Sequence, residues 1–385
     1  MKTTTKPSGL IEASDRLSKD VLAAHADEID ARRSFPRRNL ELLAQAGVSA
    51  LMVPERYGGP GGGIADMVAV LENLARGCPS TAMVSLMHFL GTAVIAAAGA
   101  DELKQTVLPQ IAAGRHLTTL AFSEAGSGGH FYTPVSEPKP NGKAATLDAF
   151  KSFVTSAGEA DSYVVSTRRP GATTPTDLDL YYVPKDTQGF EAQSPFEGMG
   201  LAGNASAAVR LVGLALFEAN RLGGAGSGFQ TMLSVVLPHF QLGSAAVSLG
   251  IASSAFDLAT RHVSSRKYEQ SGGTPLAAIP RVQFLTAEKA LELRSAQAYL
   301  DETVRRVTSS DPQALLDVLS IKIKAADAAL AVTSRAMTLG GGSAFGRRGG
   351  LERIFRDAQA AAVMAPSSDV LKDFLGKATL GLPLF

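Results

Sequence analysis

The segment LTTLAFSEAGSGGHFYTPVSEPKPNGKAATLDAFKSFVTSAGEAD, residues 117–161, marks a change in the character of the chain. Short runs rich in Thr, Val, Leu and Phe alternate here with turn-forming clusters, which is typical of strands. The pair Asn141-Gly142 is a strong hairpin signal, because both residues tolerate positive φ. Further on, Leu178, Leu180 and Tyr182 alternate as one face of a strand should. We therefore expect a β-domain over residues 117–220.

Helical patterns lie on both sides of this β-domain. Residues 1–116 are rich in Ala, Leu and charged residues, interrupted by VPERYGGPGGG at residues 53–63. Directly after that interruption, apolar residues recur at one-face spacing, the mark of a buried amphipathic helix. They are Met67, Val70, Leu71 and Leu74. The pattern predicts an N-terminal helical domain.

Residues 221–385 predict a four-helix bundle. Asp311-Pro312 places a cap and a first-turn proline at the start of a helix. Two apolar seams step by three and four residues, as in antiparallel bundles. One seam comprises Val282, Leu285, Leu293, Ala296, Leu300 and Val304, and the other comprises Leu319, Ile323, Ala326, Leu330, Thr333 and Met337. The expected fold class is α+β, in the order helices, β-domain, bundle.

Composition excludes several classes of function. The chain has 37 basic and 36 acidic side chains and no dense basic run, so nucleic-acid binding is disfavoured. Its single cysteine, Cys78, forms no internal disulfide, and six scattered histidines predict no metal site. The N-terminus lacks the apolar centre of a secretory signal, and the apolar runs are too short to span a bilayer. We expect a soluble, cytoplasmic protein.

Gly-rich motifs with other meanings are also excluded. Neither GGPGGG nor GGAGSG (residues 223–228) is followed by Gly-Lys-Ser/Thr, and neither fits a dinucleotide fingerprint. No Gly-x-Ser-x-Gly nucleophile elbow is present. Nucleotide hydrolysis, nicotinamide-dependent chemistry and serine hydrolysis therefore lose their main support.

Four segments, in order, resemble the acyl-CoA dehydrogenase family over nearly the whole chain. They are similar to that family's Val-Pro-Glu-x-Tyr-Gly-Gly turn, Thr-Glu-Pro-x-x-Gly-Ser loop, Lys-x-Trp-Ile-Thr-Asn strand and Gly-Gly-x-Gly…Leu-Glu-Arg-x-x-Arg-Asp-Ala run. Here they read VPERYGG (53–59), LAFSEAGSGG (120–129), KSFVTSAGEAD (151–161) and LGGGSAFGRRGGLERIFRDAQ (339–359).

The resemblance implies a flavin, FAD ahead of FMN, between the β-domain and the bundle. Hydroxyls and backbone amides there would contact the isoalloxazine edge, and glycines would let the backbone approach the FAD pyrophosphate or adenine side. The implied cofactor residues are Phe122, Ser123, Gly129, Phe153, Thr155, Arg266, Thr338, Gly341, Gly342 and Ser367. In the family the glycines act from a neighbouring subunit, which implies a homotetramer or homodimer. Two departures stand out: Phe153 replaces a Trp, and Glu269-Gln270 replace the Phe-Gly that follows Arg266 in the family.

The family's catalytic base is missing from both positions where it is found. Counting from the Arg-Asp-Ala run puts Ala365 at the usual Glu, and Phe240 takes the alternative position on an earlier helix. Neither side chain takes a proton. The remaining candidates are His88, His239 and Asp369. Each also has a simple structural explanation: His88 as a histidine at a helix interface, His239 as a neighbour of a kink at Pro238, and Asp369 as a helix cap.

Three functions follow from the resemblance. The first is oxidation of a small-molecule substrate, an acyl thioester on coenzyme A or a carrier protein, with electrons passed to an electron-transfer protein. The second is monooxygenation with O₂ and flavin reduced by a partner reductase, which needs no such base. The third is a non-catalytic flavin-binding subunit.

Overall fold

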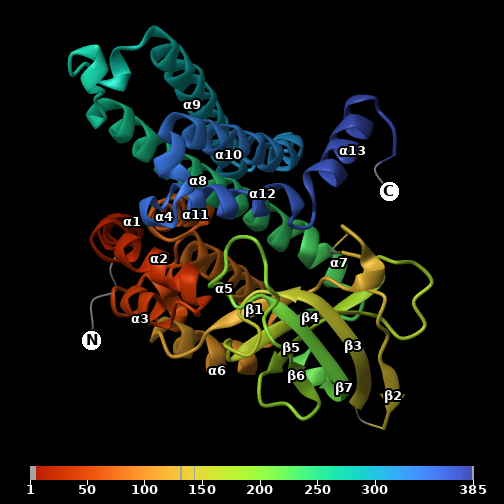
Figure 1. Cartoon of the computed structure of the whole chain (residues 1–385). Helices are drawn as coiled ribbons and strands as arrows, with labels where there is room; N and C mark the ends of the chain where they lie inside the picture. The colour runs from red at the N-terminus through yellow and green to blue at the C-terminus, as the bar shows by residue number, and fades with distance from the viewer. Residues whose placement is uncertain (1–5, 131, 143, 384–385) are drawn as a thin grey trace.

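The computed structural model describes residues 6–130, 132–142 and 144–383, and it has the predicted order of helices, strands and helices. Figure 1 shows the β-domain below, with the N-terminal helices beside it and the C-terminal helices above. The N-terminal helices are α1 (Pro7–Leu17), α2 (Ala23–Arg32), α3 (Arg37–Gln45), α4 (Ile64–Gly77), α5 (Pro79–Ala98) and α6 (Asp101–Ala112), with a π-helical turn at Ser18–Leu22.

The predicted apolar stripe of α4 is fully buried: Met67, Val70, Leu71 and Leu74 have no exposed surface. Part of this burial is against the long bundle helix α8 (Leu237–Ser265). Gly250 of α8 makes the approach close, since a Cβ there would lie 2.5 Å from the Glu72 carbonyl oxygen. The N-terminal helices and the bundle consequently share one hydrophobic core.

The β-domain contains two sheets. One has the order β1–β4–β5, with β1 parallel to β4, and the other has the antiparallel order β2–β3–β7–β6. The strands are β1 (Thr118–Ala121), β2 (Lys139–Asn141), β3 (Ala144–Val154), β4 (Ser162–Arg168), β5 (Leu178–Pro184), β6 (Phe190–Ala192) and β7 (Ala207–Phe217). The predicted hairpin joins β2 to β3, with Gly142 at φ 61°.

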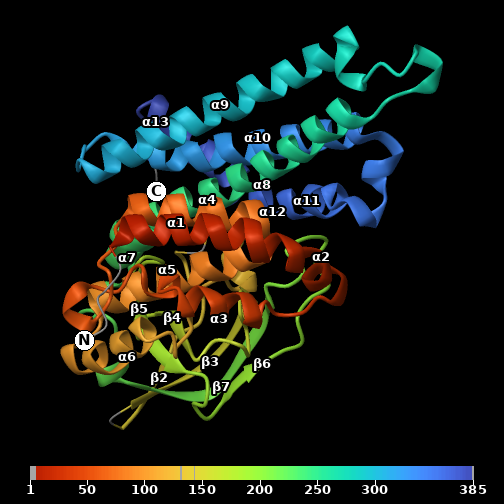
Figure 2. The ribbon, with the colours of Figure 1, turned by 90° about the vertical axis from the view of Figure 1, so that its left-hand side faces the viewer.

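The strand β5 is buried on both faces rather than on one. Leu178, Leu180 and Tyr182 contribute to the core shared with the helices. Tyr181 and Val183, which point the other way, contribute to the interior of the β-domain. The sheet β1–β4–β5 therefore separates two cores. Helix α5 covers the face of this sheet that packs against the helices, as Figure 2 shows.

The C-terminal helices are α7 (Gly228–Thr231), α8, α9 (Pro280–Thr308), α10 (Ala314–Phe345), α11 (Leu351–Ala358), α12 (Ala360–Val363) and α13 (Ser368–Thr379). Both predicted seams are confirmed, because every member is buried or half-buried on α9 or α10. The predicted helix start at Asp311-Pro312 is wrong. The Asp311 carboxylate instead accepts a hydrogen bond from the Gln313 amide at 2.8 Å, in the turn before α10 begins at Ala314.

Two helical stretches, Pro79–Ala98 and Gly228–Ser265, are long and apolar enough to cross a membrane, so the expectation that the apolar runs are too short to span one is wrong as to length. In the most apolar 18-residue part of each stretch, 72% of the first and 78% of the second is buried inside the protein. Their apolar character is therefore accounted for by packing: α5 lies between the β-domain and the bundle, and α8 lies between α4 and α10.

Candidate active site

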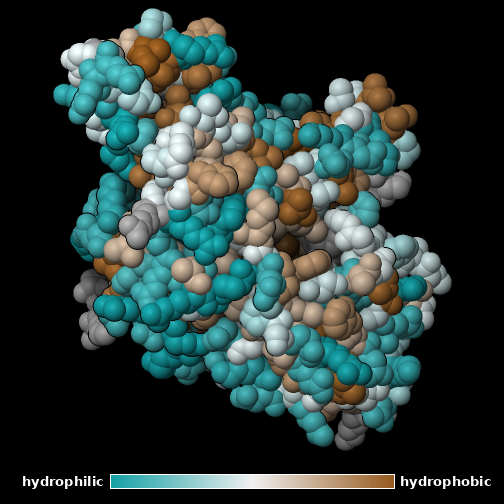
Figure 3. Space-filling view, viewed as in Figure 1, coloured by the Kyte–Doolittle hydropathy of each residue, from teal (hydrophilic) through white to brown (hydrophobic). Residues whose placement is uncertain are grey.

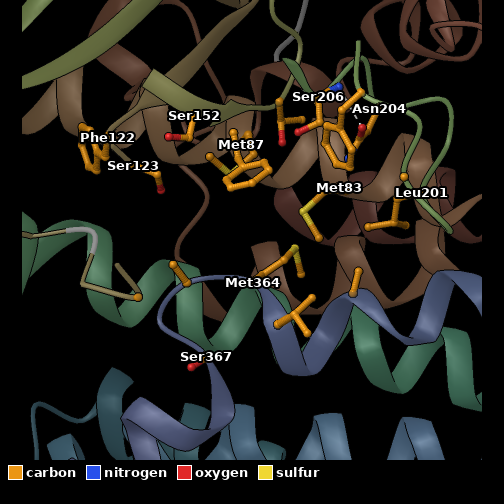
Figure 4. A pocket seen from close by; sticks show the side chains of 18 of the residues that line it. Met83, Met87, Phe122, Ser123, Ser152, Leu201, Asn204, Ser206, Met364 and Ser367 are labelled. Atoms are coloured by element: carbon orange, nitrogen blue, oxygen red, sulfur yellow. Dashed lines mark hydrogen bonds between the residues drawn. The ribbon is translucent and has the colours of Figure 1, made fainter. Parts of the chain in front are cut away.

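A cavity of about 870 Å³ lies where the N-terminal helices, the β-domain and the bundle meet. Apolar side chains gather around the hollow between the helices and the β-domain in Figure 3. In Figure 4, Ser123 and Ser152 line the cavity from the β-domain, while Met364 and Ser367 line it from the bundle. Met83 and Met87 of α5 lie between these two walls.

The β-domain wall is rich in hydroxyl groups. Ser123 follows β1, and its carbonyl oxygen accepts a hydrogen bond from the Ser152 amide of β3 at 2.8 Å. This bond places Ser123, Ser152, Phe153 and Thr155 side by side on the cavity. Within the described residues, the buried Ser152 Oγ has no hydrogen-bond partner. An unpaired buried hydroxyl costs about 1–3 kcal/mol, and this oxygen has almost no accessible surface, so Ser123 and Thr155 are the better placed hydroxyls for a ligand.

These features fit the ring of a flavin. The isoalloxazine has one polar edge of nitrogen and oxygen atoms and two flat apolar faces, and the wall offers hydroxyls together with the aromatic Phe122 and Phe153. Of the ten predicted cofactor residues, six line the cavity: Phe122, Ser123, Gly129, Phe153, Thr155 and Ser367.

The other four predicted cofactor residues lie elsewhere. Arg266 is exposed at the C-terminal end of α8. Thr338, Gly341 and Gly342 are exposed near the C-terminal end of α10, where Gly341 breaks the helix with φ 56° and ψ −145°. A single chain does not bring these residues to its own cavity. Their contact with a cofactor stays a prediction, and for the glycines the family resemblance assigns that contact to a neighbouring subunit.

Both positions counted as the missing base lie on the cavity. Ala365 lines it from the segment after α12, and Phe240 lines it from the first turn of α8. A π-helical turn at Met232–Val236 leads into α8, and Val236 and Phe240, four residues apart, face the cavity together. The expected positions are therefore in place, but both carry apolar side chains.

The carboxylate that lines the cavity, Glu124, is already fully engaged. Its oxygens accept hydrogen bonds from the Val135 amide at 2.7 Å and from the Ser136 amide at 2.9 Å. Lys151, which is completely buried, forms an ion pair with it. Although burial alone would raise the pKa of Glu124, the lysine and these donors hold it below its usual value. Glu124 joins the loop after β1 to β3 and is not available as a base.

None of the three candidate catalytic residues lines the described cavity. His88 is buried, and both ring nitrogens meet backbone groups: Nε2 donates to the Ser49 carbonyl at 3.1 Å, and Nδ1 accepts from the Thr118 amide at 3.2 Å. Burial lowers its pKa to about 4, so the ring is neutral. His239 Nδ1 donates to the Val235 carbonyl at 2.7 Å, and Asp369 is exposed in the first turn of α13.

The segment between β6 and β7 was not predicted from the sequence as part of the site. Leu201, Asn204 and Ser206 line the cavity, and Leu201 adopts φ 51°. Helix α11 holds this segment: Arg356 donates to the Met199 carbonyl at 3.0 Å, and the Asp357 carboxylate accepts from the Leu201 amide at 2.6 Å. The only sequence feature that pointed to these contacts was the pair Arg356-Asp357, and the pair alone does not show that its partners are Met199 and Leu201.

Arg356 also connects to the N-terminal helices. Its guanidinium makes a two-pronged ion pair with Asp30 of α2, at 2.9 and 2.6 Å. Paired arginine–carboxylate contacts of this kind fix geometry as well as charge. Helix α11 thus ties together all three parts of the chain that form the cavity.

Helices, a β-domain with a hydroxyl-bearing wall and a bundle surround one cavity, and the family models that match this arrangement define the class of this protein as a flavin-dependent oxidoreductase. Three family models match consecutive regions of the chain: the N-terminal domain of acyl-CoA dehydrogenase over residues 8–115, the middle domain over 119–213 and the C-terminal domain over 226–380. The chain belongs to the acyl-CoA dehydrogenase family.

Individual relatives are distant but match over almost their full length. A probable acyl-CoA dehydrogenase of Mycobacterium leprae is 27% identical over 94% of this chain and 92% of its own. The cyclohex-1-ene-1-carbonyl-CoA dehydrogenase of Geobacter metallireducens is 27% identical over 93% and 94%. The solved butyryl-CoA dehydrogenase of Megasphaera elsdenii has a TM-score of 0.91 at 22% identity and covers 99% of both chains. This last likeness confirms the fold.

Proposed function

We propose that the protein oxidises an acyl thioester with FAD bound at this cavity. The observation that carries the proposal is the placement of the hydroxyl-bearing wall opposite the segment of Ala365 and Phe240, so that a flavin and a substrate share one cavity. Relatives are named as dehydrogenases of acyl-CoA substrates. Bound FAD would supply the acceptor for the two electrons that leave the substrate.

The residues that would hold the flavin ring are Ser123 and Thr155 on the polar side, with Phe153 beside them. FAD is favoured over FMN because Arg266 and Gly341 occupy the positions that bind the pyrophosphate and adenine side in the family. The glycine contact crosses subunits in the family, so a homotetramer or homodimer is part of the proposal, as is a place in the cytoplasm.

The substrate side of the cavity is apolar. It is lined by Met83, Met87, Val236, Phe240 and Met364. Such a surface favours an uncharged acyl group, and methionine side chains adapt to different chain shapes. Either coenzyme A or a carrier protein remains as the handle, since a solved prolyl acyl carrier protein oxidase has the same fold, with a TM-score of 0.88 at 22% identity.

The α-proton is the chemical difficulty, because Ala365 and Phe240 cannot accept it and Glu124 is engaged. Losing a positioned base costs about 10²–10⁴ in rate. We expect slow turnover on simple acyl-CoAs, with faster turnover where a neighbouring group makes the α-proton more acidic.

The lack of an available base among the described cavity residues favours a second candidate function. Oxygenation by reduced flavin and O₂ needs no α-proton abstraction, so the described cavity, with its engaged carboxylate, suits that chemistry as well. The electron partner would then be a flavin reductase rather than an electron-transfer protein.

An anaerobic absorption titration tests the first proposal. The FAD-loaded protein is mixed with a panel of acyl-CoAs that includes saturated, branched and aryl-activated acyl groups. Bleaching of the main flavin band supports dehydrogenation. An unchanged band with FAD retained contradicts it, and rapid reoxidation of the chemically reduced protein by O₂ with product hydroxylation would support oxygenation. A chain that binds no flavin contradicts both.

A further inference from the structure

A buried cation lies directly behind the cavity wall. Lys322 of α10 has 1% of its surface exposed, and its Nζ donates to three backbone carbonyls. The acceptors are Ala361 at 3.2 Å, Met364 at 3.1 Å and Pro366 at 2.9 Å. An ammonium group has three donors, so this arrangement uses all of them.

The charge of Lys322 is not balanced by a carboxylate. No ion pair of the described residues includes it, and burial lowers its pKa to about 8. Burying an unpaired ammonium is costly, and apolar replacements of buried charges are often more stable. The three carbonyl acceptors therefore have to compensate this cost, which ties the ammonium to the backbone that carries them.

The three carbonyls belong to helix α12 and to the segment that follows it, where Met364, Ala365 and Ser367 line the cavity. Helix α12 ends at Val363, and Met364 turns to an extended conformation with ψ 132°. Carbonyls at a helix C-terminus have no intrahelical partner and favour a nearby cation. Met364 and Pro366 flank Ala365 on the chain, so the hydrogen bonds of Lys322 fix the backbone on both sides of that residue.

This segment also starts the next helix. Ser367 lines the cavity, and its Oγ caps α13 by accepting from the Val370 amide at 3.4 Å. The Leu371 amide donates to the Ser367 carbonyl at 3.0 Å. Any movement of Met364 and Pro366 would therefore be transmitted both to the cavity and to the first turn of α13.

We propose that Lys322 is a positioning residue for the reaction, which holds the segment Met364–Ser367 in place and puts a positive charge behind it. The charge favours negative charge that develops in the cavity during substrate oxidation. The inference rests on the proposed function for the identity of the cavity's occupants. The placement of the segment itself can be measured without flavin or substrate.

The first experiment measures amide hydrogen exchange in flavin-free Lys322→Met, whose side chain has nearly the same length but no donor. Lys324→Met, a half-buried position two residues along α10 and off the cavity, is the matched control. Loss of hydrogen bonds to a charged group predicts about ten- to a hundredfold faster exchange at residues 364–371 in Lys322→Met and no change in the control. Equal exchange in both variants would overturn the proposal.

The second experiment measures the midpoint potential and visible spectrum of bound FAD, with kcat and KM on the best substrate of the panel. Lys322→Met is expected to lower the flavin potential and to lower kcat about tenfold or more, with a smaller change in KM. A purely structural lysine would leave the potential of the folded variant unchanged, which would contradict the proposal.

A variant that does not fold is also informative. Lys322→Gln retains two donors and serves as the second substitution. If it folds, it is expected to show exchange rates and potentials between those of the wild type and Lys322→Met. If neither variant folds, Lys322 is required for the fold itself, and the assignment as a positioning residue is overturned. If the wild type binds no FAD, the exchange measurement still decides this inference while the proposed function fails.

Discussion

The substitution Ala365→Glu asks whether the cavity still has the geometry of a dehydrogenase. Ala365 is half-buried on the cavity wall, which Met364 and Ser367 of the same segment also line. The added atoms would extend into the cavity rather than into packed core, so the cost in overpacking is small. Apolar neighbours such as Phe240 and Met364 would raise the pKa of the new carboxylate towards the range in which it acts as a base near neutral pH.

The expected gain follows from the role of a general base. A positioned base contributes about 10²–10⁴ in rate, which is about 3–5 kcal/mol of barrier. The assay is steady-state desaturation of the acyl-CoA panel with an artificial electron acceptor, together with the effect of α-deuteration. A rate increase in this range, with a primary isotope effect at the α-carbon, is the predicted result.

The control is Ala362→Glu, on helix α12 three residues earlier. Ala362 is half-buried but does not line the cavity, so its carboxylate should leave the rate unchanged. The reasoning is refuted if the Ala365→Glu variant folds and binds FAD but is no faster than this control. The segment would then not hold its side chain where an α-proton would be.

Two further predictions concern buried ionisable groups. The pKa of His88 drops from 6.5 to about 4 on folding, so its contribution to the unfolding free energy is present above pH 6.5 and is lost as pH falls towards 4, by roughly 3 kcal/mol. The variant His88→Gln should therefore lose less stability than the wild type between pH 6.5 and pH 4. Urea-unfolding curves of both proteins across this pH range measure the difference. Identical pH slopes would contradict this. Glu124→Gln leaves the ammonium of Lys151 buried without its partner and should cost about 3–5 kcal/mol in the same assay, while the double variant Glu124→Gln/Lys151→Met should recover part of the loss. A double variant no more stable than the single one would argue against the pair.

Much of the fold could be predicted from the sequence because its periodic patterns are local. The apolar stripe of α4 and the seams of α9 and α10 are buried as expected. The strand β5 shows where a local pattern stops being informative. Leu178 and Leu180 alternate correctly, but the burial of Tyr181 and Val183 depends on a second core that β5 itself does not encode.

The site shows the same limit. Counting from a motif led to Ala365 and the family resemblance led to Phe240, and both residues line the cavity. His88 was a candidate catalytic residue, and its helix does line the cavity through Met83 and Met87. However, His88 is rotated by about 100° from Met87 and meets backbone groups instead. Asn204 and Ser206 could not be foreseen, because their place depends on contacts with residues more than 150 positions away, such as the bond from Leu201 to Asp357.

The position of α11 in the chain has a consequence for biosynthesis. Its Arg356 and Asp357 close the cavity against segments that leave the ribosome long before them. During translation, the β-domain can fold while its hydroxyl-bearing wall still faces water, since the opposite wall, residues 360–367, has not yet been made. Flavin loading is therefore expected to be a late event, after release or nearly so. A nascent chain stalled before α11 should display a folded β-domain that does not retain the cofactor.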